Sequence, residues 1–157
     1  MTDRTAGSAE TTAISPDEYG KTLRGLELVK ISLVNCQVNV DLDVAADAFA
    51  DAAKSSKPVR VDITDNCSFE IRENTVIVRQ TYALNSRHGR KTLIGAKAEY
   101  VVAFQASEGF TDEFFEIFQH VALPMYTWPY FRELVSSMTD RAGLPKLELG
   151  LRHIPQF

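Results

Sequence analysis

The residues that could carry out catalysis are few and scattered along the chain. His88, His120 and His153 fall in an expected turn, at an expected helix end and near the C-terminus. None has a nucleophile or carboxylate at a spacing that favours a catalytic triad, although tertiary contacts could still assemble one. The chain has no Walker loop, no glycine-rich dinucleotide turn and no paired metal-ligand motif. The sequence therefore predicts a protein that is not an enzyme and uses no cofactor or metal.

The two cysteines and the basic residues give no stronger sign of chemistry. Cys36 and Cys67 lie in strand-like contexts, where we expect small hydrophobic side chains rather than a disulfide or a metal site. The net charge of -4 argues against a nucleic-acid partner, which normally meets a basic patch. The densest basic cluster, residues 87–91, surrounds Gly89 in what we interpret as an exposed turn.

Length and composition indicate an ordinary globular chain, with 45% hydrophobic and 24% charged residues in 157. We expect a disordered N-terminal tail over residues 1–14 and a single domain over residues 15–157. No apolar run approaches the roughly 20 residues that span a bilayer. The N-terminus also lacks an apolar signal-peptide core, so we predict a cytoplasmic protein without membrane insertion.

Large aromatic side chains are unusually frequent in one part of the chain, where they can form apolar contacts. They gather between residues 114 and 131: Phe114, Phe115, Phe118, Tyr126, Trp128, Tyr130 and Phe131. Most of them are expected to pack helices onto a sheet. A single sheet covered on one face still has an open face and open edges, which a partner subunit, a client chain or both would cover.

Alternating apolar residues predict the strands that must hold these groups. Residues 26–40 read as a strand whose apolar face switches near Leu33 and Val34, as a bulge would cause. The clearest strand covers residues 59–72, where only Asp65 breaks the alternation. Residues 75–85 and 92–106 complete a meander, with Ile94 to Phe104 supplying one apolar face. One wet face and one apolar face are typical of an antiparallel sheet.

Capping signals predict the helices. Ser15 and Pro16 start a short one, and Asp43 is expected to cap an Ala-rich helix over residues 43–54. Thr111 starts a third helix that Pro124 should end. We expect Thr127 to cap the main helix, with Pro129 in its first turn and Gly143 as its stop, before an alternating strand over residues 144–149.

The block Trp128-Pro129-Tyr130-Phe131-Arg132-Glu133, followed by Leu144-Pro145-Lys146-Leu147-Glu148-Leu149, resembles the SecB family of export chaperones and SecB-like proteins. The alternating segment Val59-Arg60-Val61-Asp62-Ile63 looks like that family's strand after its crossover connection. The resemblance covers the chain from Leu26 onward and implies an α+β fold. Its parts would be a four-stranded antiparallel sheet with helices on one face, assembled as a dimer of dimers.

The resemblance also implies a function and residues for it. Members hold unfolded polypeptides in apolar grooves without nucleotide or metal, and this suits a rigid apolar surface that needs no exact hydrogen-bond match. The client-binding candidates carried over are Val59, Val61, Ile63 and, in the crossover, Phe49; plain core packing is the alternative for each. The homotetramer interface would use the main-helix residues Tyr130, Arg132, Glu133 and Ser137. For Arg132 and Glu133 a solvated pair stays open.

Departures from the family pattern bear on the kind of chaperone. Export-type members continue into another amphipathic helix and a tail that contacts the SecA motor, whereas this sequence reaches Phe157 soon after Leu149. The acidic positions used for SecA fall on Asn35 and Asn39. These departures favour protection of a dedicated partner, such as the antitoxin of a toxin–antitoxin pair, over general protein export. The alternative from another class is a structural or assembly subunit that binds one folded protein.

Overall fold

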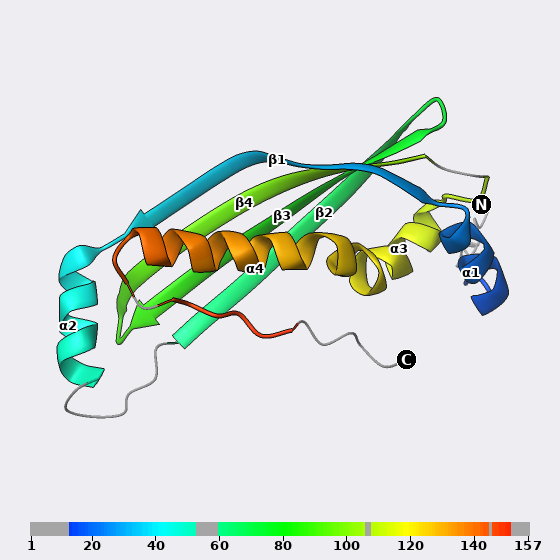
Figure 1. Ribbon diagram of the computed structural model, residues 1–157. Helices are drawn as coiled ribbons and strands as arrows, with labels where there is room; N and C mark the ends of the chain where they lie inside the picture. Colours follow the sequence, from blue (N-terminus) through cyan, green and yellow to red (C-terminus); the bar gives the residue numbers. More distant parts are fainter. Residues whose placement is uncertain (1–12, 53–59, 106–107, 145, 152–157) are drawn as a thin grey trace, which may run out of the picture.

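Four long strands form one antiparallel sheet in the order β1-β4-β3-β2 (Figure 1). The strands are β1 (Glu27–Val40), β2 (Arg60–Arg72), β3 (Thr75–His88) and β4 (Lys91–Gln105). The computed structural model describes residues 13–52, 60–105, 108–144 and 146–151. Nearly all of the predicted N-terminal tail lies outside these ranges. The meander of β2, β3 and β4 is confirmed, and β1 and β2 are the two edges of the sheet.

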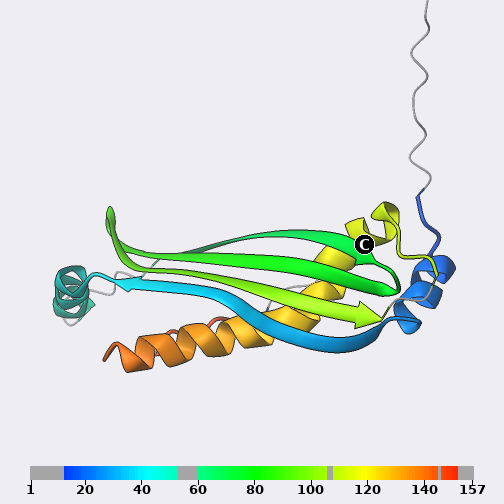
Figure 2. The ribbon, with the colours of Figure 1, turned by 90° about the horizontal axis from the view of Figure 1, so that it is seen from above.

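The helices are α1 (Pro16–Arg24), α2 (Leu42–Ala52), α3 (Asp112–Val121) and α4 (Leu123–Arg141). Seen from above, α4 runs along one side of the sheet (Figure 2). Helix α3 packs against the same face, since its Phe118 and the α4 residue Phe131 both lie in core clusters with the buried row of β4. Helix α4 runs lengthwise along that face, while α2 and α1 sit at opposite ends (Figure 1). The expected α+β arrangement, with helices on one face, is therefore confirmed.

Local capping explains where three of these helices begin. The predicted caps Ser15 and Thr111 are confirmed: Ser15 forms a capping box with Glu18 at α1, and the Thr111 hydroxyl accepts the Phe114 N–H at α3. The prediction of Asp43 as the cap of α2 is wrong. The Asp41 carboxylate accepts the backbone N–H groups of Asp43 and Val44 at 3.1 and 3.0 Å, so α2 begins at Leu42.

The prediction that Thr127 caps the main helix is also wrong, because α4 begins one turn earlier at Leu123. Pro124 lies in its first turn, where a proline ring is tolerated, so this residue starts a helix rather than only ending one. The Thr127 hydroxyl donates back to the Leu123 carbonyl at 3.1 Å instead of accepting a backbone N–H. Pro129 consequently lies inside the helix.

The core lies between the sheet and the helices. On β4 the predicted apolar row is confirmed: Ile94, Ala96, Ala98, Tyr100, Val102 and Phe104 are all buried. Tyr82, Trp128 and Phe131 centre one core cluster, toward α2, while Phe104, Phe114 and Phe118 centre another, toward α1 and α3. The opposite face of β3 and β4 carries polar groups such as the exposed Arg79–Glu99 ion pair at 3.2 Å.

Two β-bulges bend β1. Its register against β4 shifts between Leu28 and Lys30 and again between Leu33 and Asn35. The second shift confirms the expected bulge near Leu33 and Val34. A bulge inserts one extra residue, so the side chains that follow it alternate in the opposite sense. This explains why the apolar residues of β1 move from odd-numbered to even-numbered positions near Leu33 and Val34.

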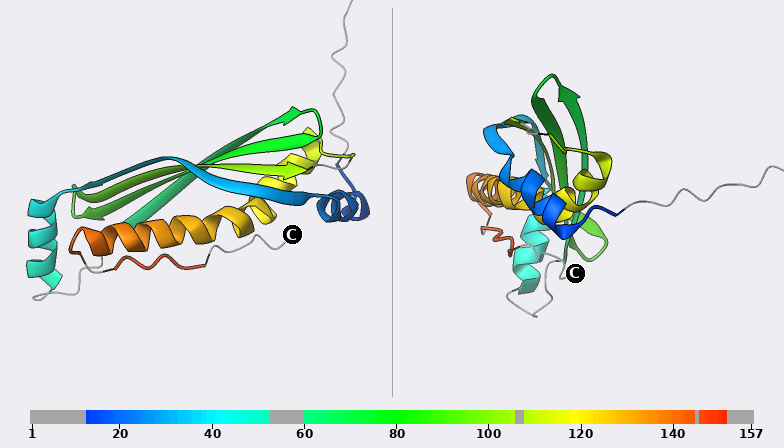
Figure 3. Two further views of the ribbon diagram at one scale, coloured as in Figure 1. Left: turned by 45° about the horizontal axis from the view of Figure 1, so that its top comes forward. Right: turned by 90° about the vertical axis from the view of Figure 1, so that its right-hand side faces the viewer.

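The predicted strand over residues 144–149 is wrong as a strand. Gly143, at φ 71°, ends α4 as expected, and its left-handed backbone reverses the chain. Residues 146–151 then run back along α4 in extended form without pairing with the sheet (Figure 3). Leu144 and Leu149 are buried in the core toward α2, so apolar contact with α4 replaces strand pairing.

Candidate polypeptide-binding surfaces

The client-binding candidates on β2 lie where an extended chain could reach them. Val61 and Ile63 share the helix-facing side of this edge strand, opposite Ser86 and Leu84 of β3. Val61 is half-buried against the core, whereas Ile63 stays 37% exposed. Val59 lies outside the described residues. Phe49 lies in α2, but its side chain is outside the described part of the chain.

The apolar row of β2 continues beyond these two residues, and we call it the β2 row: Val61, Ile63, Cys67, Phe69 and Ile71. Phe69 is covered by α3, since its ring centroid lies 4.5 Å from that of Phe115. The Cys67 thiol donates to Gln119 Oε1 at 3.0 Å, also on α3. Helix α3 therefore closes the middle of the row and leaves its two ends accessible, at Ile63 and at Ile71, which is 51% exposed.

Asp65 interrupts the β2 row with a carboxylate. Its Oδ2 lies 3.5 Å from Nε2 of Gln80, a buried polar residue on the neighbouring strand β3. Gln80 Oε1 is buried without a hydrogen-bond partner among the described residues. This polar break, visible in the sequence alternation, separates two apolar stretches rather than continuing one.

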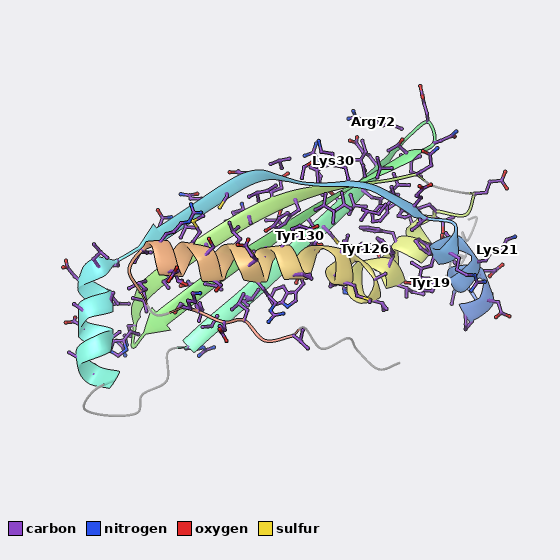
Figure 4. All side chains as sticks on the ribbon, viewed as in Figure 1. Tyr19, Lys21, Lys30, Arg72, Tyr126 and Tyr130 are labelled. Atoms are coloured by element: carbon purple, nitrogen blue, oxygen red, sulfur yellow. The ribbon has the colours of Figure 1, made fainter. Side chains whose placement is uncertain are left out.

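A second apolar surface lies on the opposite edge of the sheet. We call it the β1–α4 surface, and it consists of Leu28, Val29, Leu33, Val34 and Tyr130, all exposed. Leu33 pairs with Tyr100 of β4, and the Tyr100 and Tyr130 ring centroids lie 6.5 Å apart. Tyr130 accordingly lies on the side of α4 toward β1 (Figure 4). Sequence reasoning identified Tyr130 but not these β1 residues, which are exposed because β1 is an edge of the sheet.

Tyr100 lies beneath this surface in an apolar setting. Burial raises the pKa of its hydroxyl above the ordinary value of 10.0, as the main cause. The neighbouring Cys36, Tyr82 and Glu133 side chains add smaller contributions of the same sign. The phenol is therefore held neutral, as an apolar interior requires.

The predicted interface residues on α4 do not form one patch. Tyr130 lies toward β1, and Glu133 is exposed beside Tyr100. Ser137 is half-buried. Arg132 reaches the other way, where its Nε donates to the Leu149 carbonyl at 2.6 Å. The structure thus places Tyr130 toward β1 and Arg132 against the C-terminal segment. Glu133 is exposed between them and lines a cleft together with Arg132 and Glu148.

Both edges of the sheet offer backbone groups as well as side chains. Among the described residues no strand pairs with the outer side of β1 or of β2. Such an edge is a template for pairing with another extended chain. Backbone pairing and apolar contact together can bind a polypeptide with little demand on its sequence.

The described residues contain no group of three or more His, Cys, Asp or Glu side chains that could hold a metal ion. His88 Nε2 lies 2.8 Å from Asp51 Oδ2, and this contact joins the end of β3 to α2. No helix within the described ranges is both long enough and apolar enough to cross a membrane.

Comparison with known proteins gives matches in structure but not in sequence. No protein-family model and no curated protein matches the chain. The Mycobacterium tuberculosis Rv1957 SecB-like chaperone, solved in complex with a ChAD peptide from the Rv1956 HigA1 antitoxin, is similar with a TM-score of 0.67 and 18% identity. The match covers 88% of this chain and 99% of that one. A Streptococcus agalactiae protein of unknown function is similar with a TM-score of 0.44, 10% identity and 80% and 97% coverage. The four-stranded sheet, its helical layer and the likeness to the Mycobacterium tuberculosis chaperone show that the chain has the SecB-like fold.

Proposed function

We propose that the chain is a chaperone that binds an unfolded or partly folded polypeptide without nucleotide or catalysis. Its principal client would be a dedicated partner, such as the antitoxin of a toxin–antitoxin pair. Support comes from the SecB-like fold, together with the antitoxin peptide held by the Mycobacterium tuberculosis chaperone of similar structure.

The distribution of exposed apolar side chains carries the proposal. Ten large hydrophobic residues are exposed among the described ones. Eight of them lie on the edge strands or on α4: Leu28, Val29, Leu33, Val34, Ile63, Ile71, Met125 and Tyr130. Exposed apolar residues that gather on open strand edges mark a surface that is covered by another chain.

The two edges suit different partners. Val61 and Ile63 lie at the α2 end of β2, so the predicted client site, with Val59 and Phe49, would occupy the end of the β2 row that α3 leaves open. The β1–α4 surface would join copies of the chain, with Tyr130, Arg132, Glu133 and Ser137 as the proposed contacts of a homotetramer. Arg132 also donates a hydrogen bond to the Leu149 carbonyl of its own chain, so it holds the C-terminal segment against α4 as well.

The outer face of β1 supports a dedicated partner over general export. Asn35 and Asn39, at the positions where the family resemblance implies SecA-binding acids, are exposed and neutral. Asn35 pairs with Glu99, whose carboxylate is engaged by Arg79 at 3.2 Å. This face therefore has little free negative charge to offer a motor protein, and SecA is not among the partners we propose.

Aggregation of a chemically denatured reporter tests the proposal directly. Purified protein, without nucleotide, is added at increasing ratios as the reporter is diluted into buffer, and light scattering follows aggregation. Serum albumin at equal mass is the control for crowding. We expect suppression that saturates at a fixed ratio of chaperone to reporter. No suppression at several-fold excess would contradict a holdase and favour an assembly subunit that forms a stoichiometric complex with one folded partner.

A further inference from the structure

Helix α4 already holds one extended peptide, which is the chain's own segment 146–151. The Trp128 Nε1 hydrogen is donated to the Gly150 carbonyl at 3.0 Å, and Arg132 Nε donates to the Leu149 carbonyl. The Thr139 hydroxyl oxygen accepts the Leu147 backbone N–H at 3.1 Å. We call Trp128, Arg132 and Thr139 the α4 stripe, because their spacing places them along one side of the helix.

These contacts recognise the main chain of the segment rather than a particular sequence of side chains. Each hydrogen bond goes to a main-chain group of the segment. Gly150 is not required by space, since a Cβ built on it meets nothing within 4 Å. Only alternate side chains are sequestered: Leu149 is 6% exposed and Leu147 packs against the core, whereas Glu148 remains exposed. The stripe therefore selects an extended chain with aliphatic residues at alternate positions.

The segment does not fill the space beside the stripe. A shallow cleft of about 370 Å³ remains between the helix and the segment. Its lining includes Pro129, Arg132 and Ser136 from α4, with Glu148 and Leu149 from the segment. A chain with larger side chains than this one would find room there.

We infer that the α4 stripe is a second polypeptide-binding site, and that segment 146–151 occupies it until an extended client with alternating aliphatic residues takes its place. This inference rests on the proposed function, since it concerns the same unfolded clients. Replacing the segment by a client leaves neither Trp128 nor Arg132 without a hydrogen-bond acceptor, because the client backbone offers them the same carbonyl groups. As an attached ligand, the segment competes at a high effective concentration and so excludes weakly binding chains.

Trp128 makes the exchange measurable, because it is the only tryptophan in the chain. The probe is a dansyl-labelled peptide with the sequence of residues 144–151, and energy transfer from Trp128 reports its binding. The unaltered protein is compared with the Leu147→Ala/Leu149→Ala variant, in which the chain's own segment binds the α4 stripe more weakly. We expect the probe to bind the variant about tenfold more tightly, as an emptied competitor site requires. Adding Arg132→Met to the variant should remove most of this gain.

Equal affinity of the two proteins for the probe would overturn the inference, as would energy transfer in neither. Probe binding that instead splits a dimer of the unaltered protein, as seen by light scattering, would mean that a second copy supplies the segment. That result would also overturn the inference.

A locked protein covers the case in which the alanine variant fails to fold. Ser136→Cys and Glu148→Cys, in a Cys36→Ser/Cys67→Ser background, are joined by a short bis-maleimide across the cleft that both positions line. The unjoined protein is the matched control. We expect energy transfer to the probe in the unjoined protein and its loss in the joined one. Undiminished transfer after joining would overturn the inference. If transfer is undiminished and the joined protein still suppresses reporter aggregation, the proposed function stands and only the second site is contradicted.

Discussion

The hydroxyl groups of Tyr82 on β3 and Thr127 on α4 lie 2.7 Å apart, and both residues are fully buried. The Thr127 hydroxyl has one hydrogen, which it donates to the Leu123 carbonyl. Tyr82 is therefore the donor to Thr127. This bond fixes the main helix to the central strands at one point, between the two apolar clusters.

Removing the donor measures what this bond contributes. We expect Tyr82→Phe to lower the free energy of unfolding by about 1 kcal/mol, because Thr127 loses a buried partner but keeps its bond to Leu123. Urea denaturation gives the value, with Tyr130→Phe as the exposed control that should leave stability unchanged. A Tyr82→Phe protein as stable as the unaltered one would show that the bond adds nothing.

The same pair shows why the sequence predicted some elements and missed others. The strand face from Ile94 to Phe104 was predictable, because its alternation admits one orientation toward a core. The role of Thr127 was not predictable, since a threonine near a proline can cap the start of a helix or, inside a helix, donate its hydroxyl to the carbonyl four residues earlier. Pro124 is equally compatible with the end of one helix and the first turn of the next. The choice depends on the sheet beneath, which the local sequence does not contain.

The candidate sites divide in the same way. Alternation placed Val61 and Ile63 on the helix-facing side of β2 correctly. The alternating Leu147 and Leu149 gave an equally good strand pattern, yet they pack on α4, because segment 146–151 pairs with no strand of the sheet. Which side of α4 each residue occupies depends on the docking of the helix. Tyr130 and Arg132 therefore received the same prediction but lie on different sides.

The raised pKa of Tyr100 has a consequence for stability at alkaline pH. Unfolding exposes the phenol, whose pKa then falls to about 10, so the unfolded state loses this proton first. Stability from this group is complete below that pH and declines as the pH rises above it. We expect the free energy of unfolding to fall more steeply above pH 10 in the unaltered protein than in Tyr100→Phe. Parallel pH profiles would contradict the expectation. Tyr19, whose pKa burial also raises, contributes equally to both proteins.

Two glycines should respond to alanine with opposite signs. Gly143 has φ 71°, where a Cβ is strained, so Gly143→Ala should destabilise the protein by about 1 to 2 kcal/mol. Gly20 lies within α1, and a Cβ there meets only the flexible end of Arg24 at 3.4 Å. Gly20→Ala should stabilise by about 0.5 to 1 kcal/mol. Thermal unfolding of both variants provides the comparison, and a shift of the same sign in both would refute it.

If the β1–α4 surface joins copies of the chain, a charge placed on it should weaken their association. We expect Tyr130→Asp to lower the molar mass measured by light scattering after gel filtration, because it places a charge in an apolar contact between copies. Ile71→Asp is the matched control, since it introduces the same charge at an equally exposed apolar residue on β2, the edge strand away from this surface. A mass that falls only in the Ile71 variant would place the interface on β2 instead.

Adjacent residues of β2 separate client binding from stability. Ile63 and Thr64 are both exposed, but they lie on opposite faces of the strand, so only Ile63 belongs to the β2 row. Ile63→Asp removes apolar area that a client would bury, and burial of one such side chain is worth about 1.5 to 3 kcal/mol. We expect it to weaken binding of an unfolded reporter by roughly tenfold or more, as measured by fluorescence anisotropy. Thr64→Asp adds the same charge one residue away and should leave the affinity unchanged. Equal losses in the two variants would mean that net charge governs binding, while no loss in either would move the client site away from this end of β2.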